Sequence, residues 1–325
     1  MARADLLKKL VESSLSGNSE LLKKTLQAII AEEKNKQHSV LAKELENILI
    51  VYNHPEIKRQ FSNQLNNRRE VSSLVTEITP QKVLDDLFLD EEVVITIQKY
   101  IHEYHRRDLL RSYNIEPRNR LLFTGSPGNG KTSLAEAIAN ALMVPMYIVR
   151  YDGIIGSYLG ETASKLKKVF DYISTQNCIL FFDEFDAIAK ERGDIHETGE
   201  IKRVVNSLLM QVDKLPDYVI VIAATNHPEL LDKAVWRRFQ IRMALERPDK
   251  ITIENYLKRF TSSLEINLGT DLKKLAQEVE GSNFSDIEEM TKEIKREYVL
   301  SLPNANMKSI TNHALKSLLK KNNRT

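Results

Sequence analysis

The sequence contains a single cysteine, Cys178, and no long apolar segment. One cysteine cannot form an internal disulfide or supply the ligands of a zinc cluster, so both kinds of support are excluded. No apolar run approaches the roughly 18 residues that a transmembrane helix requires. The amino-terminal stretch carries Asp5, Lys8 and Lys9 within its apolar part, which argues against a signal peptide. We therefore expect a protein of the reducing cytoplasm, with no membrane segment and with Cys178 as a buried thiol.

The chain also lacks an excess of charge of either sign. It has 47 lysine and arginine residues against 45 aspartate and glutamate residues, a net charge of +2 at pH 7. This balance gives no indication of binding to nucleic acid or to a membrane surface. A content of 42% hydrophobic and 28% charged residues is typical of a globular protein and excludes a wholly disordered chain. At about 100–200 residues per domain, the 325 residues predict two or three domains.

Residues 1–52 show apolar side chains at helical spacing in three stretches, each with a charged opposite face. Breaks at Gly17–Ser19 and Asn35–Gln37 separate these stretches. We predict a small N-terminal helical bundle over residues 1–52; an exposed helix that docks onto another chain is the alternative. Residues 53–80 are polar and end at Pro80, so they are predicted to form a linker with little core of its own.

From Leu84 onward, short apolar runs alternate with stretches of helical pattern. Buried apolar strands that alternate with helices predict a parallel sheet covered by helices on both faces. After Pro248 the strands stop and the pattern is helical. We therefore predict a large α/β domain over residues 81–247 and an all-helical domain over residues 248–325. The predicted strands are 120–124, 146–150, 178–182, 219–224 and 240–245, with helices between them, for example at 132–142, 161–174 and 199–212.

The segment Gly125–Thr132 reads GSPGNGKT and fulfils the pattern G-x-x-x-x-G-K-[ST] between a predicted strand and a predicted helix. Its glycines allow backbone N–H groups to converge on phosphate oxygens, and the helix N-terminus adds a positive potential. Lys131 would reach the β- and γ-phosphates, and the Thr132 hydroxyl would ligate Mg²⁺. A chance match is the alternative, which the strand–loop–helix setting disfavours. The predicted nucleotide-binding residues here are Gly125, Pro127, Gly128, Asn129, Gly130, Lys131, Thr132 and Ser133.

The apolar run Ile179–Phe182 ends in two acidic residues, Asp183 and Glu184. The carboxyl end of a strand in an open α/β sheet faces the crevice where ligands bind. Asp183 is therefore predicted to hold Mg²⁺ through water, and Glu184 to orient and deprotonate an attacking water molecule. A pair of acids that caps a turn is the alternative.

A third motif follows, made of the segments ATNHP at 224–228, LD at 231–232 and RRF at 237–239. Together the three motifs resemble the AAA+ ATPases and, more narrowly, their classical AAA subgroup, over about residues 84–318. The resemblance implies an α/β fold of the P-loop NTPase type, with a parallel sheet flanked by helices and followed by an all-α lid. It also implies ATP as the substrate and Mg²⁺ as the cofactor.

The resemblance assigns further roles by position. Asn226 matches the sensor-1 residue, which binds the γ-phosphate and positions water. Arg237 and Arg238 match the arginine fingers that reach the ATP of a neighbouring subunit, a role that suits a guanidinium because it stays charged and offers a planar fork of donors. A solvated pair of arginines is the alternative. Leu87 and Phe88 match the segment that lines the adenine pocket.

The segment Gly281–Ile287 resembles the lid motif GFSGADI, with departures at residues 282–285. Ser285 lies where many other AAA+ groups place a sensor-2 arginine, and it joins the predicted nucleotide-binding residues. A small residue there agrees with the classical subgroup and disfavours a clamp loader or a replication initiator.

The segment Gly156–Glu161 matches the first pore loop of the family, an aromatic–aliphatic–glycine step that faces the axial channel of a hexamer. Tyr158 and Leu159 would grip an unfolded client polypeptide there; local packing of Tyr158 is the alternative. Glu200 and Arg203 match, more loosely, the second pore loop and the subunit interface.

The resemblance thus implies a homo-oligomeric ring, a hexamer, that hydrolyses Mg²⁺-ATP to remodel or unfold client proteins. Segments 1–11 and 31–42 also resemble small bacterial AAA ATPases of the IetAS type, which are encoded beside a subtilisin-like serine protease in phage-defence and plasmid-maintenance modules. That protease would be a separate partner.

An ESCRT-disassembly or severing ATPase, a nucleic-acid-linked loader and a nucleotide-gated scaffold remain alternatives. The near-neutral charge disfavours the loader, and Glu184 disfavours a scaffold without turnover.

Overall fold

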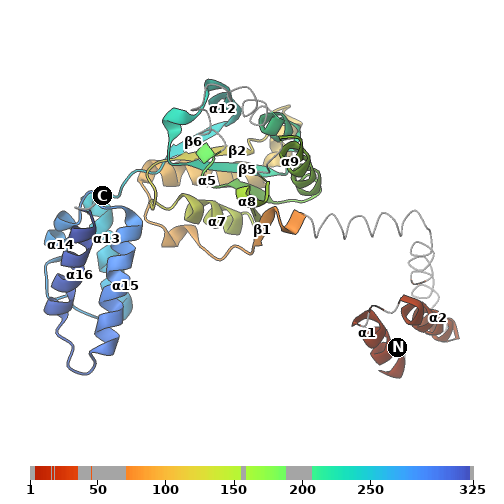
Figure 1. The fold of residues 1–325 in the computed structure, drawn as a ribbon, viewed down its shortest axis with the longest axis horizontal. Helices are drawn as coiled ribbons and strands as arrows, with labels where there is room; N and C mark the ends of the chain where they lie inside the picture. Colours follow the sequence, from red (N-terminus) through yellow and green to blue (C-terminus); the bar gives the residue numbers. More distant parts are fainter. Residues whose placement is uncertain are drawn as a thin grey trace. The chain divides into compact units, whose positions relative to one another are not determined.

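The computed structural model describes residues 4–15, 17, 19–35, 45, 71–154, 159–187 and 207–322. The chain divides into two units, Met1–Glu70 and Val71–Thr325 (Figure 1). In the first unit, helix α1 (Ala4–Leu15) packs against helix α2 (Ser19–Asn35). The third predicted helix of this unit and the predicted linker up to residue 70 lie outside the described residues, apart from Leu45.

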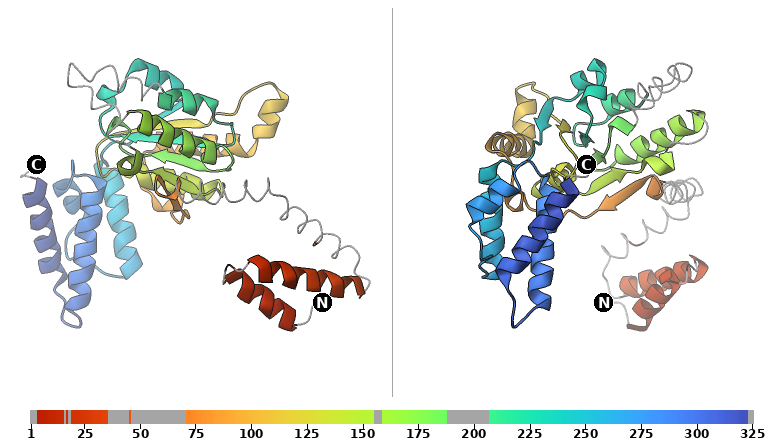
Figure 2. Two further views of the ribbon diagram at one scale, coloured as in Figure 1. Left: turned by 45° about the vertical axis from the view of Figure 1, so that its right-hand side comes forward. Right: turned by 60° about the vertical axis from the view of Figure 1, so that its left-hand side comes forward.

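A six-stranded sheet forms the centre of the second unit (Figure 2). Five strands run parallel in the order β3-β4-β5-β2-β6, and β1 pairs antiparallel with β3 at one edge. The predicted α/β fold with a parallel sheet is therefore confirmed. The strands are β1 (Val75–Ile78), β2 (Arg120–Thr124), β3 (Met146–Val149), β4 (Ile179–Phe182), β5 (Ile220–Thr225) and β6 (Ile241–Ala244).

Strand β1 lies within residues 53–80, where the sequence predicts a linker. Val71, Leu74 and Val75 are buried, and the backbone N–H of Arg150 donates to the carbonyl oxygen of Leu74 at 2.8 Å. The central strand residues 76–77 are polar and exposed, so the segment shows no apolar alternation that would predict a strand. The end of the predicted linker is thus corrected: residues 71–78 belong to the sheet and its core.

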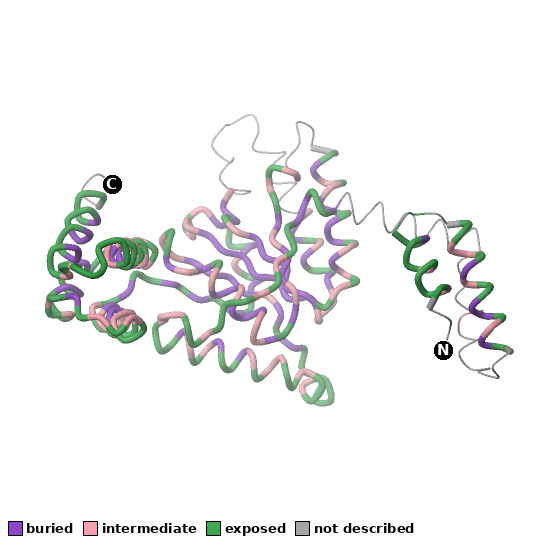
Figure 3. Tube along the Cα trace, turned by 90° about the horizontal axis from the view of Figure 1, so that it is seen from below, coloured by how far each residue is buried: buried purple, intermediate pink, exposed green. Residues whose placement is uncertain are grey.

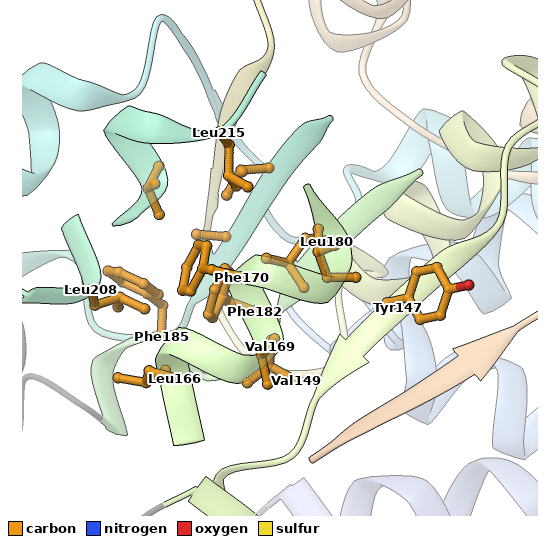
Figure 4. Close-up of a cluster of buried hydrophobic side chains, with 14 of the residues drawn as sticks. Tyr147, Val149, Leu166, Val169, Phe170, Leu180, Phe182, Phe185, Leu208 and Leu215 are labelled. Atoms are coloured by element: carbon orange, nitrogen blue, oxygen red, sulfur yellow. The ribbon is translucent and has the colours of Figure 1, made fainter. Parts of the chain in front are cut away.

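Helices cover both faces of the sheet: α5 (Glu91–His105) and α7 (Lys131–Ala141) one face, and α9 (Leu159–Ile173), residues 207–214 and α12 (Lys233–Arg238) the other. In β4, Ile179 and Phe181 pack under α5 and α7. Leu180 and Phe182 point to the opposite core, which Figure 4 shows. Since both faces are covered, the central strands β4 and β5 are nearly continuous apolar runs. Cys178 is fully buried in this second core, and burial raises the pKa of its thiol to about 12.

Four helices follow β6 and surround a core of their own: α13 (Lys250–Leu264), α14 (Leu272–Glu278), α15 (Phe284–Leu300) and α16 (Met307–Asn322). The Asp249 carboxylate caps α13 by accepting from the Thr252 N–H at 2.8 Å, and Asp271 caps α14 in the same way. Figure 3 shows that buried residues follow the strands and recur along one side of these helices. We refer to α13–α16 as the lid.

Among its described residues, the second unit also has the short elements η1 (Leu84–Asp86), α6 (Arg107–Ser112), α8 (Tyr151–Ile154) and η3 (Pro228–Leu230). In the part of the chain that the structure describes, no helix has the length and apolar character needed to cross a membrane.

Candidate functional site

The loop between β2 and α7 has a backbone shape that favours glycine at three positions. Gly125, Gly128 and Gly130 have φ angles of 133°, 80° and 87°, which other residues rarely adopt. A Cβ at Gly125 would lie 2.1 Å from the carbonyl oxygen of Leu245, and one at Gly128 would lie 2.2 Å from Oγ of Ser285. The loop therefore packs closely on its neighbours and ends at the N-terminus of α7, where unpaired N–H groups attract anions.

Lys131 is the first residue of α7, and its side chain lies within this loop. Its ammonium group donates to the carbonyl oxygens of Gly125 at 2.7 Å and of Ser126 at 2.9 Å. The side chain is buried, and this burial lowers the pKa of Lys131 against the opposing effect of the Asp183 and Asp186 charges. A partly desolvated ammonium beside converging N–H groups is well suited to bind phosphate.

Thr132 and Asp183 connect α7 to the carboxyl end of β4. The Thr132 hydroxyl donates to Oδ2 of Asp183 at 2.8 Å, and Oδ1 of Asp183 accepts from the Glu184 N–H at 2.9 Å. A hydroxyl and a carboxylate are hard oxygen ligands, and Mg²⁺ is usually held by one or two such groups together with water and substrate phosphates. The donor set therefore fits Mg²⁺ beside the loop.

Glu184 and Asn226 lie at the ends of the two central strands, β4 and β5. Glu184 has a φ of 46°, a strained backbone of the kind that clusters at functional sites. Oδ1 of Asn226 is buried and has no hydrogen-bond partner among the described residues. Both residues line the same cavity, and a buried acceptor of this kind is normally satisfied by a ligand or an ordered water.

Asp186 holds the strand end that carries Asn226. Its Oδ1 accepts from the Thr225 hydroxyl at 2.8 Å and from the Asn226 N–H at 3.3 Å, and the side chain is buried. The sequence pattern does not identify Asp186 as a functional residue, because the pattern is that of any acidic residue in a turn. The only local signal is its position two residues after Glu184.

One cavity of about 540 Å³ brings these groups together. Its walls come from the segment before α5, from the loop between β2 and α7 together with the ends of β4 and β5, and from the lid. We refer to the loop Gly125–Gly130 as the phosphate loop. Gly125 lies beside the cavity, where its carbonyl accepts from Lys131. The predicted site residues that line it are Leu87, Phe88, Pro127, Gly128, Asn129, Gly130, Lys131, Thr132, Ser133, Asp183, Glu184, Asn226 and Ser285.

Three aromatic rings form the apolar part of the cavity wall. The rings of Phe88 and Phe284 are nearly parallel, with centroids 5.9 Å apart. The ring of Tyr256 lies edge-on to both, at 5.2 Å from Phe88 and 5.0 Å from Phe284. This apolar end of the cavity suits a nucleobase, as the end at the loop and the strand ends suits phosphate. Tyr256 and Phe284 belong to the lid and reach the cavity only through the tertiary fold.

The two predicted arginine fingers lie in the last turn of α12 and do not line the described cavity. Arg238 is half-buried, and its Nε donates to Oδ2 of Asp213 at 2.9 Å. Arg237 is exposed and makes no hydrogen bond or ion pair with the residues that the structure describes. Arg238 is thus bound within its own chain, whereas the Arg237 guanidinium remains available to a second molecule.

The predicted pore-loop residue Tyr158 lies outside the described residues, as do Glu200 and Arg203. Leu159 is the first residue of α9, and the structure does not describe its side chain. Their roles stay predictions.

Comparison with known proteins identifies the family. Residues 121–247 match the family described as "ATPase family associated with various cellular activities (AAA)". The chain is 35% identical over 290 residues to y4kL of Sinorhizobium fredii, an uncharacterised AAA family ATPase, and the match covers 89% of this chain and 87% of that protein. The chain belongs to the AAA family of ATPases. The predicted resemblance to this family is confirmed, and the protein is an ATP-binding enzyme that hydrolyses ATP.

The AAA ATPase is also similar to parts of longer proteins. It is 35% identical over 232 residues to a putative 26S proteasome regulatory subunit homologue of Methanothermobacter thermautotrophicus, covering 59% of that protein. It is 34% identical over 178 residues to the ATP-dependent zinc metalloprotease FtsH of Clostridium perfringens, covering 25% of that protein. Within the described ranges, no group of three or more histidine, cysteine or acidic residues could hold a metal as a zinc protease does.

Proposed function

We propose that this AAA ATPase couples the hydrolysis of Mg²⁺-bound ATP to the remodelling or unfolding of client polypeptides, as a homo-oligomeric ring in the cytoplasm. The observation that carries the nucleotide chemistry is the Thr132–Asp183 hydrogen bond, which joins the phosphate loop to the acidic end of β4 within one cavity. Work on polypeptides is supported by the similarity to the proteasome regulatory subunit homologue and to FtsH.

The polar end of the cavity would bind the triphosphate through the loop N–H groups and the Lys131 ammonium. Thr132 and Asp183 would hold Mg²⁺, which supplies charge neutralisation at the β- and γ-phosphates when bound. The adenine would lie at the aromatic end, against Phe88 and Phe284, whose rings are already stacked on each other.

Glu184 would then orient and deprotonate the attacking water molecule, because its carboxylate lies at the strand end next to Asp183. The unpaired amide oxygen of Asn226 would position the same water. The exposed Arg237 would stabilise the charge that develops on the nucleotide of a neighbouring subunit. Each site would therefore need a second copy of the chain to reach full activity.

Unfolding of a fluorescent protein with an unstructured tag tests the client part of the proposal. We expect Tyr158→Ala to abolish ATP-dependent unfolding while ATP binding and most basal hydrolysis persist, because an aromatic ring grips varied side chains without demanding a sequence. Tyr158→Phe is the matched control and should unfold the client. Unfolding by Tyr158→Ala at the parent rate would overturn the pore-loop assignment, and loss of ATP binding would assign Tyr158 a structural role.

We further propose that a separate subtilisin-like serine protease works with this ATPase in defence against phage. The proposal rests on the resemblance of segments 1–11 and 31–42 to ATPases of such modules. Plaque counts on cells that express the ATPase alone, or with the protease encoded beside it, test this directly. Protection should require both proteins and should be lost with Glu184→Gln; protection by the ATPase alone would contradict the proposal.

A further inference from the structure

Lys82 places a second ammonium group beside the phosphate loop, outside every motif described above. Its side chain lines the nucleotide cavity. Its Nζ donates to Oγ of Ser133 at 2.5 Å and lies 3.9 Å from Oε2 of Glu136. The side chain is 47% exposed, so the ammonium can reach a ligand in the cavity without a large desolvation cost.

The backbone that carries Lys82 is held along α7 independently of its side chain. Oε1 of Glu136 accepts from the N–H groups of Gln81 at 3.1 Å and of Lys82 at 3.3 Å. The Asn140 side-chain amide, one turn further on, donates to the carbonyl oxygen of Pro80 at 3.5 Å. The ammonium can therefore exchange the Ser133 hydroxyl for another acceptor while its backbone stays in place.

The position of Lys82 along the cavity indicates which part of a nucleotide it meets. Lys131 and Thr132 mark the end that takes the β- and γ-phosphates, and the loop N–H groups cradle the α- and β-phosphates. Ser133 lies one residue further into the first turn of α7. Phe88, six residues after Lys82, lines the aromatic end that suits the base. The hydrogen bond to Ser133 therefore places the Lys82 ammonium beside the first turn of α7, next to the residues that would take the phosphates.

We propose that Lys82 binds a phosphate that ATP and ADP share, the α- or the β-phosphate. This proposal rests on the proposed nucleotide site and adds a second cation to it. Because ATP and ADP share these two phosphates, Lys82 strengthens the binding of both, whereas a contact to the γ-phosphate would favour ATP alone. Glu136 balances part of the ammonium charge when no phosphate is in contact. The alternative is a purely structural role as a latch, in which the Lys82 side chain only holds its own segment against α7.

Calorimetric titration of the full-length protein with ADP and with a non-hydrolysable ATP analogue tests the proposal. We expect Lys82→Ala to weaken both ligands by about tenfold, the size of a charge-assisted hydrogen bond at a half-exposed site. Lys82→Arg should restore most of the affinity. Glu136→Gln is the matched control, since it keeps an acceptor for the two backbone N–H groups while it removes the charge, and it should bind both ligands at least as tightly as the parent.

Thermal unfolding without nucleotide separates binding from a latch. The proposal predicts the parent melting temperature for Lys82→Ala and a smaller stabilisation by added ADP. A lower melting temperature without nucleotide, with affinity unchanged, would assign the latch role and overturn the proposal. If Lys82→Ala bound only the ATP analogue more weakly and bound ADP like the parent, the contact would be assigned to the γ-phosphate instead. If the parent bound ADP and Lys82→Ala bound it equally, only this proposal would fail; if the parent bound neither ligand, the nucleotide site itself would fail.

Discussion

The hydroxyl of Thr132 donates to Oδ2 of Asp183 at 2.8 Å, across 51 positions of sequence. This single contact joins the first turn of α7 to the carboxyl end of β4. It therefore sets the relative position of the phosphate loop and the acidic residues that follow β4, to which we assign metal binding and hydrolysis in the proposed function.

Thr132→Ala should raise the Mg²⁺ concentration needed for half-maximal hydrolysis. Loss of groups that merely orient a metal ligand typically costs about 10–100-fold in metal affinity or activity, so loss of a ligand itself should cost at least about tenfold. Thr132→Ser keeps the hydroxyl and should behave like the parent. The measurement is the ATPase rate during a Mg²⁺ titration of all three proteins. An unchanged Mg²⁺ dependence in Thr132→Ala would exclude the hydroxyl as a ligand.

Asp186→Ala should lower kcat while the affinity for ADP stays near that of the parent. Asp186 touches no nucleotide in this account but holds Thr225 and the backbone of Asn226, so it acts as a positioning residue. Misplacement of a reacting group by about 1 Å can cost about 100-fold in rate. Asp186→Asn keeps an acceptor oxygen and should retain more activity. The measurements are steady-state kinetics and a titration with ADP. If kcat and the affinity for ADP fell equally, Asp186 would support the structure of the whole site rather than position Asn226.

Arg237→Ala should reduce turnover by roughly 10³-fold, the scale of an arginine finger, without lowering the melting temperature. Its side chain is exposed and makes no bond or ion pair with the described residues, so the fold loses nothing. Arg238→Ala should instead destabilise its own chain, because Arg238 is paired with Asp213.

Mixing Arg237→Ala subunits with Lys131→Ala subunits should restore part of the activity. One subunit then supplies an intact nucleotide site and the other an intact finger. For the parent, ATPase activity per subunit should rise with protein concentration as rings assemble. No recovery on mixing, together with constant specific activity across dilution, would place the arginine's role within a single chain.

The sequence predicts the parallel sheet because its central strands, β4 and β5, are apolar runs that are buried on both faces. Strand β1 cannot be predicted in the same way, because Thr76 and Glu77 are exposed at the sheet edge and only the ends of the strand are apolar. Its pairing with β3 depends on tertiary structure, in particular on the burial of Leu74 and Val75 against α8 and β3.

The same contrast holds at the candidate site. The phosphate loop and the pair Asp183 and Glu184 are local patterns, each formed by neighbouring residues in one segment, so they can be predicted from sequence. Tyr256 and Lys82 lie far from both patterns along the chain. They reach the cavity only because the lid and the segment before α5 fold against it. No spacing of residues in the sequence connects them to the phosphate loop.

Single-turnover hydrolysis by Glu184→Gln tests the central claim most directly. The account predicts that this variant binds ATP with the affinity of the parent, because Lys131, Thr132 and Asp183 are intact, and that it keeps the ATP unhydrolysed. Without a base the rate should fall by roughly 10²–10⁴-fold. Hydrolysis at the parent rate, or loss of ATP binding, would contradict the assignment of Glu184 as the base in this cavity.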